Sequence, residues 1–531
     1  MMQHVSSEPV SAPAHGRTGR DRPDDCSREA VACVVMAELE RVMLPAAAGP
    51  LSTQSSLVDA GIDAGRLSDA LVRIEGLYGM RFRAEWLASI HTCGDLIDCV
   101  SERMFDAADR PTMVAGDPPV IDSPRRGMEA LSSDPFPECA ALEERLAALA
   151  ENGLANPFLL ANEEVHGRTA TIAGRDVVSF ASFDYLGLAG HPDVTRAAKD
   201  AIDRFGTSAS ASRMVGGNTT LLDALDAELA AFLGTERATV FPCGYGTNAS
   251  VFAHLFGAGD LILHDELAHD SIVRGAAASR AGKRSFRHND ADQLDGLLRD
   301  LRGNYRRVVV ALEGVYSMDG DYPDLPRFLE VKRRHDAMLY VDEAHSIGTM
   351  GREGRGICEF FGVDPAEGDL WMGTISKALG SGGGYLAGAR RLIDYLGFTT
   401  PSFVFSTACS PANAAAALEA VRVISREPWR VTRLRERSGL FLKLAIEAGL
   451  DTGPSGNTPV IPIIVGSSHR ALAVSQRLLE RGINARPILY PAVRESAARI
   501  RFFITSEHSE EEIVRTVQEL AAAVAAGAIP A

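Results

Sequence analysis

The residues best suited to chemistry are a lysine and an acidic residue followed by a histidine, each placed just after an apolar run. Lys377 lies in the sequence GTISKALG (residues 373–380), which a serine and three glycines follow. Asp342 and His345 come after the apolar run 338–341. A lone lysine is usually solvent-exposed. These neighbours instead indicate a ligand site, because open α/β sheets bind ligands at the carboxyl ends of their strands.

Together these residues supply what pyridoxal phosphate chemistry requires. That cofactor needs an amine for a Schiff base, a carboxylate to keep its pyridine nitrogen protonated, and backbone donors for its phosphate. Lys377, Asp342 and the glycine-rich loop provide one of each. The eight cysteines are dispersed without a CxxC pair, so we expect reduced thiols and no structural metal site.

The hydrophobic pattern predicts the elements that position these groups. From about residue 140 to residue 526, short apolar runs alternate with helical patterns, which is typical of a largely parallel sheet covered by helices. The runs occupy residues 238–241, 260–264, 308–312, 338–341 and 370–373. The predicted fold class is therefore α/β.

This part of the chain resembles the α-oxoamine synthases, a family of fold-type-I pyridoxal phosphate enzymes. The matching motifs occur in family order: DYLGL (184–188), SRMVGG (212–217), GY (244–245), EGVYSMDGD (313–321), VDEAHSIG (341–348), GRG (354–356) and the lysine loop. The resemblance implies a fold-type-I transferase with a mainly parallel sheet in a large domain and a smaller C-terminal α/β subdomain.

The resemblance also assigns residues to the ring of the cofactor. It implies that Lys377 forms the Schiff base and later acts as general base. Asp342 is expected to pair with the pyridine nitrogen and His269 to stack on the ring face. His345 is expected to point at the phenolic oxygen, with Ser317 in contact there or close by. Lys377, His269, Asp342 and His345 are thus the expected catalytic residues.

Further residues are expected to hold the phosphate and the substrate. By the resemblance, the amides of Gly244 and Tyr245 bind phosphate at a helix N-terminus, and Thr374 adds a hydroxyl. The family is dimeric, and Thr407 matches a stretch that reaches the phosphate of the neighbouring subunit, so we expect a homodimer. Arg501 matches the arginine that binds the carboxylate of the amino acid.

The reaction implied is a decarboxylative condensation of a small L-amino acid with an acyl thioester, either acyl-CoA or an acyl-carrier protein. Its products are an α-amino ketone, carbon dioxide and free thiol. Phe183 replaces a frequent asparagine, and an aromatic residue there, like Glu507-His508, resembles the serine palmitoyltransferase branch. Serine is therefore favoured, with glycine or alanine as alternatives. Leu222 and Arg274 replace a frequent histidine and aspartate, which leaves the acyl chain open.

Two other readings compete with this one. Another fold-type-I reaction, aminotransfer or simple decarboxylation, would use the same lysine and aspartate. A noncatalytic partner subunit is the second alternative, and the presence of Lys377, Asp342, His269 and His345 together argues against it.

The N-terminal part resembles an acyl carrier protein over about 80 residues. Apolar residues between positions 67 and 78 fall on one helical face. Carrier proteins bear their phosphopantetheine arm on a serine after an aspartate, but here Asp63 is followed by Ala64 and the next serine is Ser68. We expect a disordered tail (1–25), a carrier-like helical domain lacking the arm-bearing serine (26–106), a proline-rich linker (107–137) and the catalytic domain (138–527). A simple helical bundle remains the alternative.

Composition limits the partners. The formal net charge is −16, from 54 Lys+Arg against 70 Asp+Glu in 531 residues, and no basic block offers a nucleic-acid surface. No apolar run approaches the roughly 18 residues that cross a bilayer. The first 25 residues contain no basic segment followed by an apolar one, so we expect no secretory signal and a cytoplasmic protein.

The carrier-like domain generates one prediction. If it recruits an acyl-carrier partner or positions the substrate of the catalytic domain, deleting residues 1–137 should reduce turnover with at least one acyl donor. Turnover is measured with acyl-CoA and acyl-carrier donors in parallel, on full-length and shortened protein. Unchanged turnover with every donor would contradict the hypothesis.

Overall fold

A computed structural model of the chain describes residues 136–151 and 153–526. Before them it describes residues 32, 35, 36, 39, 52–57, 62, 67, 71, 74 and 90–105. The chain divides into two compact units, Met1–Ser132 and Ser133–Ala531. The expected tail (1–25), the linker up to residue 135, and Asp63, Ala64 and Ser68 lie outside the described residues.

The first unit contains a small apolar cluster. Helix α4 (Cys93–Phe105) contributes Leu96, Ile97 and Val100 to it. Leu71 and Ile74, which lie on the helical face expected from the sequence, are also buried in this cluster. These residues form a packed core, while the likeness of this unit to a carrier protein stays a prediction.

The second unit is built around a seven-stranded sheet with the strand order β4-β10-β9-β8-β7-β5-β6. Strand β10 runs antiparallel to both of its neighbours, and the pairs from β9 to β6 are parallel. The strands are β4 (Arg237–Phe241), β5 (Asp260–Asp265), β6 (Gly282–Phe286), β7 (Arg307–Glu313), β8 (Met338–Asp342), β9 (Leu370–Thr374) and β10 (Gly384–Gly388). The predicted largely parallel α/β fold is therefore confirmed.

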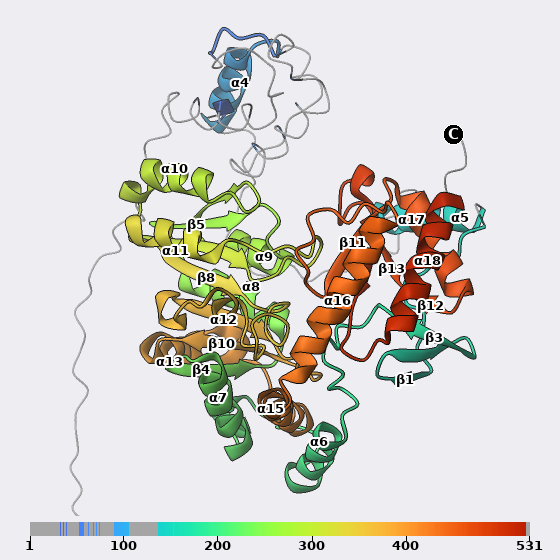
Figure 1. Cartoon of the computed structure of the whole chain (residues 1–531). Helices are drawn as coiled ribbons and strands as arrows, with labels where there is room; N and C mark the ends of the chain where they lie inside the picture. Colours follow the sequence, from blue (N-terminus) through green and yellow to red (C-terminus); the bar gives the residue numbers. More distant parts are fainter. Residues whose placement is uncertain are drawn as a thin grey trace, which may run out of the picture. The chain divides into compact units, whose positions relative to one another are not determined.

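Helices cover this sheet (Figure 1). Two large buried clusters, one containing Val310 and Leu339 and the other Val309 and Tyr340, hold the apolar side chains that strands and helices share. The helices are α5 (Pro137–Glu151), α6 (Pro192–Phe205), α7 (Thr220–Leu233), α8 (Gly244–Leu255), α9 (Asp270–Ala278), α10 (Ala291–Leu301), α11 (Leu325–Arg334), α12 (Ile357–Phe361), α13 (Arg390–Thr399), α14 (Pro401–Val404), α15 (Pro411–Arg426), α16 (Trp429–Glu447), α17 (Ser468–Glu480) and α18 (Glu510–Ala526). In the described part of the chain, none of the helices is long and apolar enough to cross a membrane.

A smaller subdomain joins the two ends of the second unit. A three-stranded sheet has the order β11-β14-β13, and a four-stranded sheet has the order β1-β2-β3-β12. Figure 1 shows β1 and β3 beside the C-terminal elements drawn in orange and red. The strands are β1 (Glu164–His166), β2 (Thr169–Ile172), β3 (Arg175–Ser179), β11 (Val460–Ile464), β12 (Ile483–Asn484), β13 (Arg486–Ile488) and β14 (Arg499–Phe503). The expected C-terminal subdomain is present, and it also includes strands from residues 164–179.

An ion-pair cluster connects the loops at the carboxyl edge of the large sheet. His288, which follows β6, lies 2.9 Å from Asp265 at the end of β5 and 2.8 Å from Asp321 beyond β7. Burial alone would lower the pKa of His288, but hydrogen bonds and charge attraction from Asp265 and Asp321 raise it to about 10. The charged imidazole therefore holds three loops together.

The cluster predicts a pH-dependent contribution to stability. The pKa of His288 is raised above its unfolded value, so its contribution is full below about pH 6.5 and is lost as the pH rises through about 10. His288→Gln should lower the free energy of unfolding by roughly 3 kcal/mol at pH 6.5, the scale for removing one partner of a buried pair.

Denaturant unfolding at pH 6.5, 8 and 9.5 checks this. The difference between wild type and His288→Gln should shrink at each step upward in pH. The exposed His166, paired with Glu164, provides a control, since His166→Gln should leave stability unchanged. A difference that stays constant or grows with pH would refute the role of the charged His288.

Candidate active site

The lysine loop leaves the sheet at the end of β9 and brings Lys377 to a histidine from the neighbouring strand. Nζ of Lys377 lies 2.8 Å from Nε2 of His345 and 5.6 Å from the centre of the Phe183 ring. His345 lies three residues beyond β8, which pairs with β9 in parallel. Parallel pairing therefore unites two of the predicted site residues at one edge of the sheet.

Asp342 is buried at the end of β8 and is held by two donors. Its carboxylate accepts hydrogen bonds from Nδ2 of Asn248, at 2.7 Å, and from the backbone N–H of Ala344, at 2.9 Å. Asn248 lies on α8, and its Oδ1 accepts a hydrogen bond from the hydroxyl of Tyr340 at 2.7 Å. These bonds orient the carboxylate and stabilise its charge.

The side-chain amide of Asn248 also links Asp342 to His269. Nδ2 of Asn248 donates to Oγ of Ser271 at 2.9 Å, and that oxygen lies 2.6 Å from Nδ1 of His269. His269 also caps α9 through the backbone N–H of Ser271. The sequence analysis missed Asn248 and Ser271. The only available signal was the position of Asn248 in the helix that begins at Gly244.

Burial and charge set the protonation states around the lysine. Burial lowers the pKa of Lys377 to about 8, although Asp342 and Glu313 attract the proton. Burial and the charge of Lys377 hold the pKa of His345 well below its ordinary value. Burial likewise lowers the pKa of His269. The lowered pKa values favour the neutral form of both histidines, and they give the lysine a free-amine fraction of about one tenth at pH 7, far above that of an ordinary lysine.

Glu313 belongs to this electrostatic group. It ends β7 directly opposite Asp342 in the strand register. Burial and the neighbouring Asp342 raise the pKa of Glu313 well above its ordinary value, and its Oε1 has no hydrogen-bond partner. Glu313 therefore keeps its proton, which avoids two adjacent charged carboxylates.

The residues expected at the phosphate lie where α8 begins. A Cβ on Gly244 would come within 2.8 Å of the hydroxyl of Thr374, so only glycine lets the helix approach this closely. No side chain caps the first turn of α8, which leaves its amides available to an anion. The ring of Tyr245 meets His269 edge-on at 6.1 Å, and its hydroxyl donates to Asp270 at 2.8 Å.

Arg501 lies on β14 as a half-buried guanidinium. Its Nη1 donates to the backbone oxygen of Ser317 at 2.7 Å, and its Nε is buried without a hydrogen-bond partner. In residues 153–526 no carboxylate lies within ion-pair distance of it. Burial lowers the pKa of Arg501 to about 10. An unpaired buried donor is costly, so this guanidinium is suited to a carboxylate ligand.

Cavities open on two sides of the site. One of about 880 Å³ is lined by His269, Ser317 and the segment 490–494, among others. Another of about 440 Å³ is lined by Lys377, Phe183 and other residues. Together they give a substrate access to both the lysine side and the histidine side.

Thr407 is not brought to the other site residues. It is exposed, and among the described residues no hydrogen bond connects it to the rest of the site.

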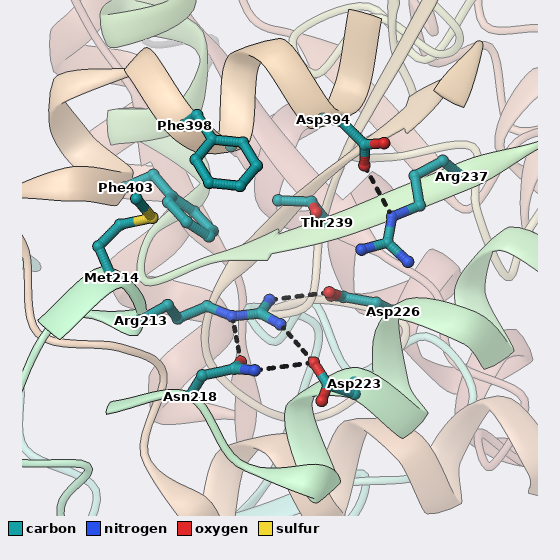
Figure 2. Close-up of a pocket in the computed structure, with 11 residues that line it drawn as sticks. Arg213, Met214, Asn218, Asp223, Asp226, Arg237, Thr239, Asp394, Phe398 and Phe403 are labelled. Atoms are coloured by element: carbon teal, nitrogen blue, oxygen red, sulfur yellow. Dashed lines mark hydrogen bonds and ion pairs between the residues drawn. The ribbon is translucent and has the colours of Figure 1, made fainter. Parts of the chain in front are cut away.

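A third cavity, of about 180 Å³, lies away from these residues (Figure 2). Arg213 lies 2.9 Å from Asp226 and 3.2 Å from Asp223, and Asn218 accepts from its Nε at 2.8 Å. These ion pairs and this hydrogen bond tie Arg213 to α7 and to the loop before it, although its Nη1 makes no hydrogen bond. The cavity also has an apolar side, where Figure 2 shows Met214, Phe398 and Phe403.

Comparison with known proteins identifies the family. Residues 175–520 match the family of aminotransferases of class I and II. The chain belongs to this family. Its sequence is 39% identical to the 8-amino-7-oxononanoate synthase of Symbiobacterium thermophilum over 372 residues, which is 70% of this chain and 94% of that enzyme.

Solved structures agree with this assignment. The serine palmitoyltransferase of Sphingomonas wittichii shares 31% sequence identity and a TM-score of 0.71, over 74% of this chain and 99% of that one. The enzyme of S. paucimobilis, solved with bound PLP and myriocin, shares 28% identity and a TM-score of 0.72 over the same fractions. Both groups of relatives are α-oxoamine synthases, so the resemblance of the catalytic part of the chain to this family is confirmed, as is the fold-type-I pyridoxal phosphate fold.

The site residues of this α-oxoamine synthase fit pyridoxal phosphate. The structure places Lys377 in the loop after β9 and the hydrogen-bonded carboxylate of Asp342 on the neighbouring strand β8, while the N-terminus of α8 packs closely against Thr374 at Gly244. The unpaired Nε of Arg501 suits the carboxylate of an amino acid. The donor set therefore matches the chemistry that the family requires.

Proposed function

We propose that this protein condenses a small L-amino acid with an acyl thioester, releasing carbon dioxide and free thiol and forming an α-amino ketone. The observation that carries the proposal is the convergence of Lys377, His345 and Asp342 beside an arginine without a carboxylate partner. The relatives named 8-amino-7-oxononanoate synthase and serine palmitoyltransferase support it.

Each residue has a role in this reaction. Bound pyridoxal phosphate supplies an electron sink for the α-carbon of the amino acid. Asp342 holds a proton on the ring nitrogen, His345 and Ser317 hold the phenolic oxygen, and His269 covers the ring. The amides of Gly244 and Tyr245, with the hydroxyl of Thr374, bind the phosphate.

Substrate binding and proton transfer fall to two residues. Arg501 binds the carboxylate and orients the α-carbon. Nζ of Lys377 then accepts the α-proton, and a pKa near 8 suits a general base that works close to neutral pH. Burial around the lysine excludes water, which strengthens the electrostatic interactions of these groups.

Serine is the amino acid we favour, with glycine or alanine as alternatives. Phe183 lines the cavity beside Lys377 and packs edge-on against His345 at 5.9 Å and Phe503 at 4.6 Å. An aromatic residue at this position supports the serine palmitoyltransferase branch. The acyl donor is either a CoA or a carrier-bound thioester.

We propose a homodimer in which Thr407 contacts the phosphate of the partner subunit. Phe405, two residues earlier, is 85% exposed, Val215 is 83% exposed and Phe398 is 67% exposed. Exposed aromatic and aliphatic side chains on neighbouring segments are typical of a covered interface. We also propose that residues 26–106 dock an acyl-carrier partner.

A spectroscopic titration tests the proposed reaction. Serine, glycine and alanine are added to the cofactor-loaded protein while its absorbance is recorded, and acyl-CoA or acyl-carrier donors follow. We expect one amino acid to change the spectrum, and a donor then to release stoichiometric thiol and amino ketone. Keto acid without thiol would indicate aminotransfer, and an amine with carbon dioxide would indicate simple decarboxylation. A spectrum indifferent to every amino acid would point to a noncatalytic subunit.

Arg501 provides a second prediction. Arg501→Gln removes a charged donor to the carboxylate, worth about 1.5–3 kcal/mol, so KM for the amino acid should rise about 10- to 100-fold. KM for the acyl donor should change little. Arg433, an exposed residue stacked on Trp429, provides the control Arg433→Gln. An unchanged KM for the amino acid in Arg501→Gln would exclude the assigned role.

A further inference from the structure

One buried tyrosine contacts the site without a role in the reaction proposed above. Tyr185 follows β3 in the DYLGL motif, and its side chain is fully buried. Its hydroxyl lies 2.7 Å from Nδ1 of His345. No second hydrogen-bond partner of this hydroxyl occurs in residues 153–526. Tyr185, His345 and Lys377 therefore form one continuous hydrogen-bonded chain.

The donors and acceptors in this chain follow from the protonation states of Tyr185 and His345. Burial raises the pKa of Tyr185, so its hydroxyl keeps a proton. With His345 as its one partner, the hydroxyl donates to Nδ1. A neutral imidazole has one donor and one acceptor nitrogen. If Nδ1 accepts, Nε2 carries the proton, and this N–H points at the lysine amine 2.8 Å away.

The opposite arrangement leaves a proton without a partner. If Nδ1–H donated to the tyrosine oxygen, the hydroxyl proton of Tyr185 would need another acceptor inside an apolar environment. The rings of Phe503 and Phe183 pack near this pair. An unsatisfied buried donor costs about 1–3 kcal/mol, which favours the first arrangement.

We propose that Tyr185 is a positioning residue that fixes His345 in the tautomer with its proton on Nε2. His345 then presents only a donor to Lys377 and to the phenolic oxygen of the cofactor. An N–H donor facing the amine disfavours the ammonium form, since both groups would donate. The tautomer thus disfavours protonation of Lys377 and leaves proton removal to its amine. This inference rests on the proposed cofactor site but not on the choice of substrates.

Other charges also act on the amine. Asp342 and Glu313 favour its protonated form, whereas Arg501 disfavours it. His345 itself faces Lys377, Arg501 and His269. Removing the hydroxyl of Tyr185 changes its hydrogen bond to His345 and its electrostatic interaction with Arg501, and leaves Asp342 and Glu313 unaltered.

The test compares Tyr185→Phe with the matched variant Tyr385→Phe. Tyr385 is equally buried, but its hydroxyl has no hydrogen-bond partner. The rate at which cofactor-free protein binds pyridoxal phosphate is measured by absorbance from pH 6 to 10, because binding requires the neutral amine of Lys377. In Tyr185→Phe, Nε2 becomes free to accept from the ammonium. The midpoint of the pH profile should then rise by about one unit, equivalent to about tenfold slower binding below the midpoint.

The outcomes separate this inference from the proposed function. Tyr385→Phe should keep the wild-type midpoint. A wild-type midpoint in folded Tyr185→Phe would overturn the inference while leaving the proposed function intact. Wild-type protein that never binds pyridoxal phosphate would overturn both.

If Tyr185→Phe does not fold, the variant His345→Gln tests the same inference. In His345→Gln the amide oxygen is able to accept from the ammonium, so the midpoint should again rise. A lower midpoint would mean that His345 accepts from the lysine in the wild-type protein, and the inference would be wrong.

Discussion

The protonation of one buried lysine amine is the interaction on which the rest of the site depends. Burial lowers the pKa of Lys377, and the carboxyl groups of Asp342 and Glu313 oppose that shift. The effect of burial is larger than that of the carboxyl groups, since the pKa of Lys377 is lowered to about 8. The pKa of Glu313 is itself raised by burial and by Asp342, so the protonation of Glu313 and that of the amine depend on each other.

The strand register and the hydrogen bonds explain why the adjacent carboxyl groups of Glu313 and Asp342 differ in charge. Glu313 and Asp342 lie opposite each other at the ends of β7 and β8, where both cannot easily be charged. Asp342 receives hydrogen bonds from Asn248 and from the backbone of Ala344, whereas Glu313 has only one, from the backbone of Ser317, and its Oε1 has no partner. Hydrogen bonding thus places the negative charge on Asp342, the residue that faces the ring nitrogen in our proposal.

The strands and site residues that could be predicted from the sequence are those marked by an apolar run or a motif within a few residues. The five apolar runs became β4, β5, β7, β8 and β9, because continuous apolar segments are typical of strands buried on both faces. Strand β6 was missed because it lies at the edge of the sheet and exposes Lys283 and Arg284, as edge strands often do. Lys377, Asp342 and Arg501 were predicted through motifs, and their roles stay predictions. Asn248 stood in no motif and Tyr185 had no role within DYLGL, because their partners lie 94 and 160 residues away in the chain and only the folded sheet brings them together.

The site also couples the smaller subdomain to the large sheet. The backbone N–H of Ser506 donates to Tyr185, at 2.8 Å, and that of Phe503 donates to Phe180, at 2.9 Å. The segment that carries Arg501 is thus hydrogen-bonded to the segment that carries Tyr185. Tyr185 in turn reaches His345 on the large sheet. A shift of β14 would therefore move the guanidinium of Arg501 and the hydroxyl of Tyr185 together, so under our proposals substrate orientation and the protonation of the lysine amine depend on the same backbone contacts.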